Sequence, residues 1–385
     1  GPDQEFYAGS ALRVRPDGTG LEVLGHNFRN PYELTLDSFG NIWQSDNDDD
    51  GNEWARINYV MRGGNHGFWG PGGKRWREDR GSHFHQENPG VVPTVLRTGF
   101  GSPCGIVVYE GDLLPSRFQG NLLHVDNGPR VLRLYQINNQ DAGFTITSET
   151  TIDGADTWFR PSDVAVAPDG SIFIADWYDA VVGGHQMKDK EMGRIYRLAP
   201  PGHRPRRVRV DLSSAEGRAA ALSSPAQAIR HLAHDHYQKM SSGAIEELTQ
   251  LLDKGNSVLE ARALWLLGAA GPNGLEHVLA RRQSADFKFR LLAVRILREN
   301  HSDFLNTVQP MISDRNPQVR REIALALKDF SGPAARDSWI QLATQYDGQD
   351  RWYLEALAIG ARGKESRLYT DLRHSFPGAW DSKLG

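Results

Sequence analysis

Residues 28–70 read FRNPYELTLDSFGNIWQSDNDDDGNEWARINYVMRGGNHGFWG, and this stretch decides the fold. Two apolar runs at 34–36 and 42–43 flank a short turn around Asp37, which is typical of a β-hairpin. An arginine turn precedes the hairpin, while an acidic loop at 46–53 and a third strand follow it. This order predicts one blade of a β-propeller with its functional groups at one rim.

The same order recurs along the first half of the chain. Arg29 and Arg160 occupy equivalent places in two of the copies, as do Asp46 and Asp176. Repetition at intervals of roughly 40–70 residues indicates a propeller, whose closed forms need four to eight blades. Because the sequence holds roughly three and a half copies, we expect a partial chain that contains the carboxyl-terminal blades of a larger propeller.

The composition changes at Pro200. Residues 200–211 are rich in proline and arginine, and after them apolar residues at helical spacing replace the alternating strands. Small residues recur in this part at intervals of 30, 30, 31 and 32 positions, at Ala233, Ala263, Ala293, Ala324 and Ala356. This spacing is typical of paired-helix repeats of the HEAT kind. We therefore expect a multidomain chain: an all-β propeller over 1–199, a linker over 200–211, and an all-α HEAT-like solenoid over 212–385.

Composition excludes several classes of protein. The net charge is −4 and the isoelectric point is near 6.4, so the chain shows no overall basic character that would indicate a nucleic-acid partner. A single cysteine, Cys104, cannot form an internal disulfide. No apolar run approaches the roughly 18 residues that a membrane span requires. At 385 residues the chain suits two domains, each long enough to bury its own core.

The acidic loop is a candidate metal site. Asp46, Asp48 and Asp50 alternate ahead of Gly51, and hard oxygen ligands at alternate positions before a glycine suit Ca²⁺. The loop is not an EF-hand, because its twelfth position is Ile57 instead of Glu. The other interpretation is a solvated acidic turn without a metal.

Two arginines are candidates for binding an anionic ligand. Arg29 and Arg160 each lead an inner strand, and inner strands line the axial channel of a propeller. Two guanidinium groups there could pair with the carboxylates of one ligand. The other interpretation is an ordinary salt bridge to an aspartate of a neighbouring blade, such as Asp163 or Asp126.

The histidines are less informative. His83 and His85 alternate on an extended segment and could bind a transition metal, although surface histidine pairs are common. His66 suits a packing role. His124 ends an inner strand and is a weak candidate for a catalytic group that faces the channel. Cys104 is expected to be a buried small residue at the entry of a blade.

Residues 9–199 resemble the β-propeller of the PQQ-dependent glucose and sorbosone dehydrogenases. The resemblance rests on FRNP, the acidic loop, GGNHGF, FRPSDVAVAPDGSIFIADW and GRIYRL. With the helical repeats, the chain is similar to large membrane-bound dehydrogenases that often carry a cytochrome c domain further on. The resemblance implies a six-bladed propeller, a periplasmic or extracellular location and a cytochrome c electron acceptor.

The resemblance also implies an activity, which is oxidation of a sugar or other alcohol by hydride transfer to PQQ. It assigns Ca²⁺ to Asp46, Asp48 and Asp50, and it assigns the quinone to Arg29, Asn30, Arg130 and Arg160. The chain departs from the family pattern at two places. The general-base histidine would lie in an earlier blade, and the turn that ends at Arg130 replaces an expected lysine. The sequence also contains no haem-attachment motif.

Two other functions are compatible with the sequence. The first is a calcium-dependent propeller lactonase, with ligands drawn from Asn30, Asp163 and Asp176. The second is a non-catalytic protein that recognises carbohydrate or protein, because solenoids present extended binding faces. Whether the chain is a dehydrogenase or a binding protein, we expect the solenoid to be an interaction module for a protein partner.

Overall fold

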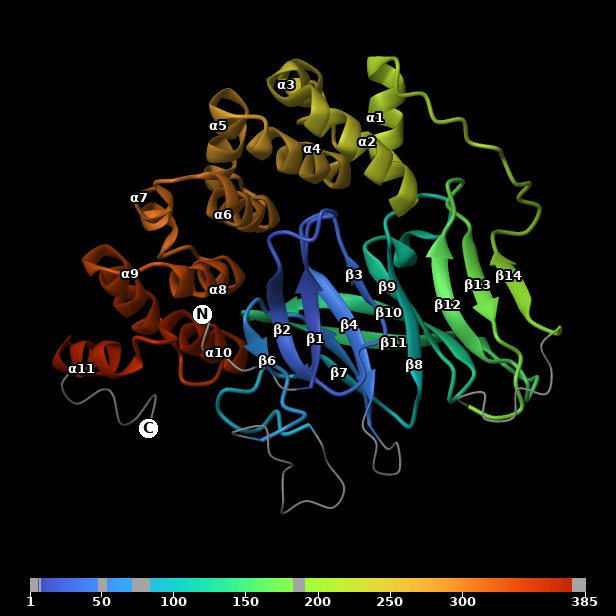
Figure 1. The fold of residues 1–385 in the computed structure, drawn as a ribbon, viewed down its shortest axis with the longest axis horizontal. Helices are drawn as coiled ribbons and strands as arrows, with labels where there is room; N and C mark the ends of the chain where they lie inside the picture. The colour runs from blue at the N-terminus through green and yellow to red at the C-terminus, as the bar shows by residue number, and fades with distance from the viewer. Residues whose placement is uncertain (1–5, 7, 48–53, 71–83, 183–190, 376–385) are drawn as a thin grey trace.

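The computed structural model describes residues 6, 8–47, 54–70, 84–182 and 191–375. Within these residues the chain forms four small sheets, which are followed by a helical region (Figure 1). The last strand ends at Leu198 and the first helix begins at Ala215, so the predicted change from strands to helices is confirmed.

The sheets follow one another along the chain, and neighbouring strands are antiparallel except for the parallel pair β2–β6. The first sheet contains β1 (Gly9–Arg13), β2 (Glu22–Phe28) and β6 (Gly64–Asn65). The second contains β3 (Leu34–Leu36), β4 (Ile42–Asn47), β5 (Ala55–Tyr59) and β7 (Leu96–Gly99). The third contains β8 (Pro103–Tyr109), β9 (Asn121–Asp126), β10 (Val131–Gln140) and β11 (Gly143–Asp153). The fourth contains β12 (Pro161–Val166), β13 (Ile172–Asp176) and β14 (Arg194–Leu198).

Local turn chemistry explains the hairpins. In the β3–β4 turn the Asp37 carboxylate accepts the backbone N–H groups of Phe39 and Asn41, and Gly40 has a φ of +88°. The β3–β4 hairpin that the sequence predicts is therefore confirmed. The first strands of three successive sheets, β3, β8 and β12, pack beside one another, which is the arrangement that the blade prediction requires.

The helical region is built from pairs of helices. The helices that carry the alanine repeat are α2 (Gln227–Met240), α4 (Ser257–Ala269), α6 (Phe287–Asn300), α8 (Pro317–Ala326) and α10 (Arg351–Ala361). The others are α1 (Ala215–Ser223), α3 (Ile245–Thr249), α5 (Pro272–Ala280), α7 (Phe304–Val308), α9 (Pro333–Ala343) and α11 (Glu365–Ser375). A side-chain oxygen caps the amino terminus of α4, α6, α8 and α10, from Asn256, Asp286, Asn316 and Asp350.

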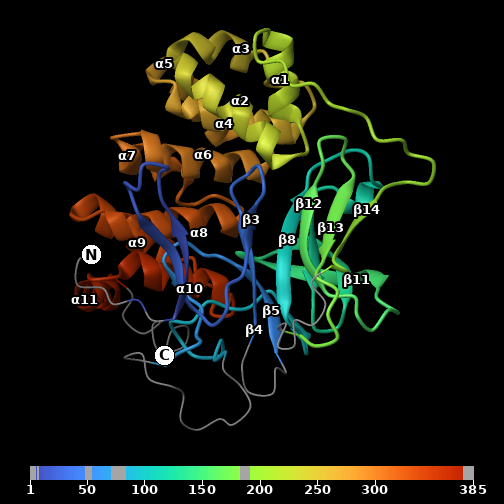
Figure 2. The same cartoon turned by 45° about the vertical axis from the view of Figure 1, so that its right-hand side comes forward.

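The alanine repeat sets the packing of these helices. Each of the five alanines lies on an even-numbered helix, α2 to α10, and each is fully buried. Small side chains at this seam let successive helices pack closely. The even-numbered helices α4 to α10 lie toward the sheets, and α5, α7, α9 and α11 lie outside them (Figures 1 and 2).

One hydrophobic core joins the sheets to the helices. It includes Trp43, Tyr59 and Phe144 from the sheets together with buried residues of every even-numbered helix. The Arg321 guanidinium of α8 lies over the Tyr59 ring at 4.7 Å and donates to the Ala142 carbonyl oxygen. The two regions, for which the sequence predicts separate cores, therefore share this one. None of the helices in the described ranges could cross a bilayer.

Candidate functional site

Three sheets end in the same way. The second strand of each carries a buried aspartate at its end, and this carboxylate accepts a backbone N–H from the turn that enters the first strand. The pairs are Asp46 with Arg29 and Asn30 at 2.9 and 2.6 Å, Asp126 with Ser102 at 2.7 Å, and Asp176 with Arg160 at 2.8 Å. The predicted equivalence of two of these copies is confirmed, and the third sheet supplies another copy.

A cavity of about 480 Å³, which we call the rim pocket, lies where these ends meet. Its functional side chains are Asn30, Tyr32, Asn47, Cys104, Asn127 and Trp177. Three of them directly follow a capping aspartate, at positions 47, 127 and 177. The repeated strand end therefore places one side chain from each of three sheets around a single space.

The lining of the rim pocket combines amide and aromatic side chains with one thiol. Asn127 is 5% exposed, and its Oδ1 has no hydrogen-bond partner among the described residues. Trp177 and Tyr32 present partly exposed aromatic surfaces. Burial, with the negative charge of Asp126, raises the pKa of the Cys104 thiol to about 12. Cys104 is therefore a neutral thiol and no nucleophile at physiological pH.

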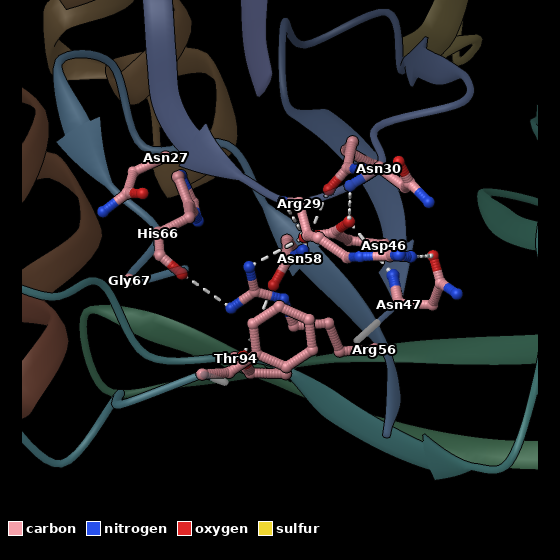
Figure 3. A network of polar contacts seen from close by, with 12 residues as sticks. Asn27, Arg29, Asn30, Asp46, Asn47, Arg56, Asn58, His66, Gly67 and Thr94 are labelled. Carbon is pink, nitrogen blue, oxygen red and sulfur yellow. Dashed lines mark hydrogen bonds and ion pairs between the residues drawn. The ribbon is translucent and has the colours of Figure 1, made fainter. Parts of the chain in front are cut away.

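Beneath this rim lies a buried polar network (Figure 3). The Arg56 guanidinium donates to Asp46 Oδ2 at 2.9 Å and to the His66 carbonyl oxygen at 2.7 Å, and both side chains of the Arg56–Asp46 ion pair are 0% exposed. The Phe84 ring lies 3.5 Å from the guanidinium carbon. This network joins β4 and β5 to the loop that leaves β6.

The structure describes one of the three predicted calcium ligands, Asp46. Asp48 and Asp50 lie outside the described residues. Asp46 uses both carboxylate oxygens within the protein, where it accepts the N–H groups of Arg29 and Asn30 and the Arg56 guanidinium. No group of three metal-ligating side chains occurs in the part of the chain that the structure describes. Calcium binding stays a prediction, and the contacts of Asp46 assign it a structural role.

The four predicted quinone-binding residues differ in their position relative to the rim pocket. Asn30 lines the rim pocket, and Arg29 Nη1 donates to Asn47 Oδ1 of the same pocket at 3.3 Å. Arg160 is buried and donates to the carbonyl oxygens of Phe159 and Ala180. Arg29, Arg130 and Arg160 are not part of the pocket wall.

Arg130 and Arg160 nevertheless lie close together beside the pocket. Burial, followed by the positive charge of Arg130, lowers the pKa of Arg160. Arg160 forms no ion pair within 4.0 Å in the described ranges, and its Nε lacks a partner there. Neither Asp163 nor Asp126 pairs with it, while the negative charges of Asp176 and Asp179 act on Arg160 in the opposite direction to Arg130.

His66, His85 and His124 do not line the rim pocket. His124 is fully buried against Tyr135, does not line the rim pocket, and has its pKa lowered to about 3 by burial. His66 stacks on Phe28 with ring centres 4.1 Å apart, in agreement with a packing role. His85 Nδ1 lies 2.7 Å from Glu87 Oε1, while His83 lies outside the described residues.

Glu33 is a candidate that sequence reasoning missed. It follows Tyr32 of the rim pocket, and its Oε2 accepts the Ile106 backbone N–H at 2.9 Å. Burial, with a smaller contribution from the negative charge of Asp163, raises the pKa of Glu33 to about 7. A carboxyl group with such a pKa can hold or release a proton near neutral pH. Its sequence signal was limited to its place directly after the FRNPY turn.

Comparison with known proteins gives three results. A family model described as "Domain of unknown function (DUF7133)" matches residues 3–202. No curated protein matches the chain. Among solved structures, the chain is similar to a PQQ-bound aldose sugar dehydrogenase from Streptomyces coelicolor, with 23% identity over 50% of this chain and 52% of that chain and a TM-score of 0.34.

Two further solved structures are a glucose dehydrogenase and the PQQ domain of a pyranose dehydrogenase from Coprinopsis cinerea. The first has 18% identity over 48% of this chain and 49% of that chain, with a TM-score of 0.36. The second has 14% identity over 40% of this chain and 53% of that chain, with a TM-score of 0.29. The chain therefore spans about half the length of these structures. Identities and TM-scores at this level show no function for this chain.

Proposed function

We propose that this chain, which belongs to the DUF7133 family, binds a carboxylated quinone of the PQQ type in the rim pocket and takes part in oxidising a sugar or other alcohol. The observation that carries this proposal is the meeting of three equivalent strand ends at one cavity of about 480 Å³. That volume lies within the range of roughly 300–1,000 Å³ that is usual for small-molecule sites.

The residues present fit such a group. Trp177 and Tyr32 offer flat surfaces to a ring system, and the unpartnered Asn127 Oδ1 is an acceptor that a ligand could satisfy. The Arg130 and Arg160 guanidinium groups, which lie near each other, could pair with carboxylates of such a ligand.

When bound, the quinone supplies an acceptor for the hydride that leaves the alcohol carbon. The chain's own residues would bind and orient the reactants. Asn30, Asn47 and Asn127 can each donate or accept hydrogen bonds at the wall of the pocket. Glu33 follows Tyr32 of the pocket and has a pKa of about 7, but it is not part of the pocket wall, so we assign it no catalytic step. No step is assigned to a metal.

Titration of the chain with PQQ tests this proposal. We expect a change in quinone absorbance and quenching of tryptophan fluorescence, since Trp177 lines the pocket. Arg29→Ala should weaken binding by roughly threefold to tenfold, because it removes the guanidinium that donates to Asn47 of the pocket wall and so orients that amide. The matched control is Arg117→Ala, because Arg117 is exposed, pairs with Glu149 on the surface and does not line the rim pocket. Absence of PQQ binding, or equal affinities for the two variants, would contradict the proposal.

A carbohydrate-binding role without catalysis is the second candidate. It is favoured by the wall of the rim pocket, which combines three amide side chains with two aromatic side chains. Saccharide binding that needs no PQQ and yields no oxidised product would support it. We also infer, from the sequence resemblance alone, a periplasmic or extracellular location, calcium dependence and a cytochrome c acceptor.

A further inference from the structure

A second polar cavity lies at the opposite end of the sheets from the rim pocket. It consists of two adjoining spaces of about 310 and 570 Å³, which share walls at Glu110, Gln119, Gly120, Ser257 and Val258. We call the joined space the basal groove. It lies between the β3–β4 and β8–β9 turns and the amino-terminal ends of α4 and α6. Trp43 of the groove and Asn47 of the rim pocket are four residues apart on β4, so about 13 Å separates them along this strand.

The wall of the smaller space holds two buried polar atoms that lack partners. Trp43 is 0% exposed, and its Nε1–H has no acceptor among the described residues. Asn41 Oδ1 has no donor there, although its Nδ2 donates to Asp37 Oδ2 at 2.7 Å, which fixes the orientation of the amide. A buried polar group without a partner is unfavourable, so one donor and one acceptor await a ligand or water. A hydroxyl group can satisfy both kinds of atom.

The remainder of this wall alternates aromatic and amide side chains. Phe39 and Phe287 are partly buried beside the space, and the Lys288 ammonium lies 5.9 Å from the centre of the Phe39 ring. Gln119 and Asn139 are exposed at its edge and carry amides that can donate and accept. Aromatic surfaces with a small number of placed polar groups are the usual composition of a small-molecule site.

The charges around the groove disfavour a charged ligand. The Glu110 carboxylate pairs with Arg262 at 2.9 Å, and both side chains are less than a tenth exposed. Burial, followed by the charge of Glu110, raises the pKa of Asp37 to about 6, so a further anion would be repelled. The walls also hold Arg262 and Lys288 together with Glu110 and Asp112, so these four charges balance one another.

We propose that the basal groove binds a neutral polyhydroxylated ligand of the monosaccharide or short-oligosaccharide class. Ring faces of the ligand would pack on Phe39 and Phe287, while its hydroxyl groups would satisfy Trp43 Nε1 and Asn41 Oδ1. This site is separate from the rim pocket and does not depend on a quinone. It would make the junction of sheets and helices a binding surface in its own right.

Calorimetric titration with glucose, maltose and myo-inositol tests the proposal, with gluconate and glucosamine as charged probes. We expect saturable binding of at least one neutral probe and weaker binding of both charged ones. Gln119→Ala and Asn139→Ala should each lower the affinity for the neutral probe roughly threefold to tenfold, because each removes one neutral hydrogen bond. Gln119 is exposed, so Gln119→Ala should change the melting temperature little, while Asn139→Ala also removes the hydrogen bond that Asn139 Oδ1 accepts from Gln318.

Trp177→Ala in the rim pocket is the matched control, and it should leave this affinity unchanged. Binding that Trp177→Ala removes and Gln119→Ala leaves intact would place the saccharide in the rim pocket and overturn the proposal. Tighter binding of gluconate or glucosamine, or no binding of any neutral probe, would overturn it too. Failure of PQQ to bind would affect the proposed function and leave this inference standing.

Discussion

At the scale of single residues, Asp46 shows how one buried carboxylate can hold several segments in place. It caps the Arg29–Asn30 turn through two backbone N–H groups and neutralises the buried Arg56, which in turn holds the loop after β6 (Figure 3). Removing one partner of a buried ion pair leaves the other charge uncompensated, and this is more costly than losing a surface pair.

We predict that Asp46→Ala lowers the free energy of unfolding by about 3–5 kcal/mol, measured by urea denaturation. The control is Asp156→Ala, whose carboxylate forms an exposed pair with Arg194, and it should cost less than about 1 kcal/mol. Both measurements are repeated with EGTA. If chelation removed the difference between wild type and Asp46→Ala, Asp46 would be a calcium ligand instead of a structural group.

Glu33 predicts a pH dependence. Its pKa is about 7 in the folded chain and 4.5 in the reference state, so folding favours the protonated form. The stabilisation from that proton is complete below about pH 4.5 and is lost as pH rises through about 7. The Glu33→Gln variant lacks this titration and should gain melting temperature relative to wild type between those values. A constant difference across the range would refute the assigned pKa.

At the scale of secondary structure elements, the close approach of β8 and β12 depends on Gly105. A Cβ atom at this position would lie 2.6 Å from Asp163 Oδ1 and 2.7 Å from the Val164 backbone nitrogen. These strands are the first strands of adjacent sheets, and β8 begins at Pro103 of the rim pocket. Their spacing therefore affects the site as well as the fold.

Gly105→Ala should destabilise the protein by about 1–3 kcal/mol, because β12 backbone atoms cannot move aside as a flexible side chain could. Gly243→Ala serves as the control, since its Cβ would meet no atom within 4 Å. Thermal unfolding of the two variants gives the comparison. Equal melting temperatures would show that the two strands are not in tight contact in solution.

At the scale of the whole molecule, the helices hold the sheets through a series of arginines. Each of the four even-numbered helices from α4 to α10 contributes one, at Arg262, Arg295, Arg321 and Arg351, and each donates to sheet or loop groups more than 150 residues away. The inner face of the helical region is therefore occupied by its own chain. A protein partner, if the predicted one exists, would have to use the outer helices.

We expect a protease to cut first between residues 203 and 211, which contain no helix or strand and are largely exposed. The two fragments should stay together in size-exclusion chromatography, because the shared core and the arginines remain. The double variant Arg295→Ala and Arg321→Ala should release them at lower urea concentration. Fragments that separate in native buffer would contradict a shared core.

Sequence periodicity was sufficient for the elements and their order. Alternating strands, Asp-containing turns and the alanine repeat are local patterns, and each acts within one hairpin or one helix pair. They predicted the change from strands to helices near residue 200 and the equivalence of Asp46 with Asp176. The repeated capping aspartate could also have indicated Asn47, Asn127 and Trp177, which follow it directly.

The partners of each functional side chain were decided only by tertiary structure. Asp46 read as a metal ligand in the sequence, yet in the fold its oxygens are used by Arg29, Asn30 and Arg56. His124 lies in the core, and the basal groove exists because α4 and α6 lie against turns more than 100 residues earlier. Burial, unpartnered atoms and pKa shifts arise from such long-range contacts, and a local pattern carries no information about which distant segment will supply them.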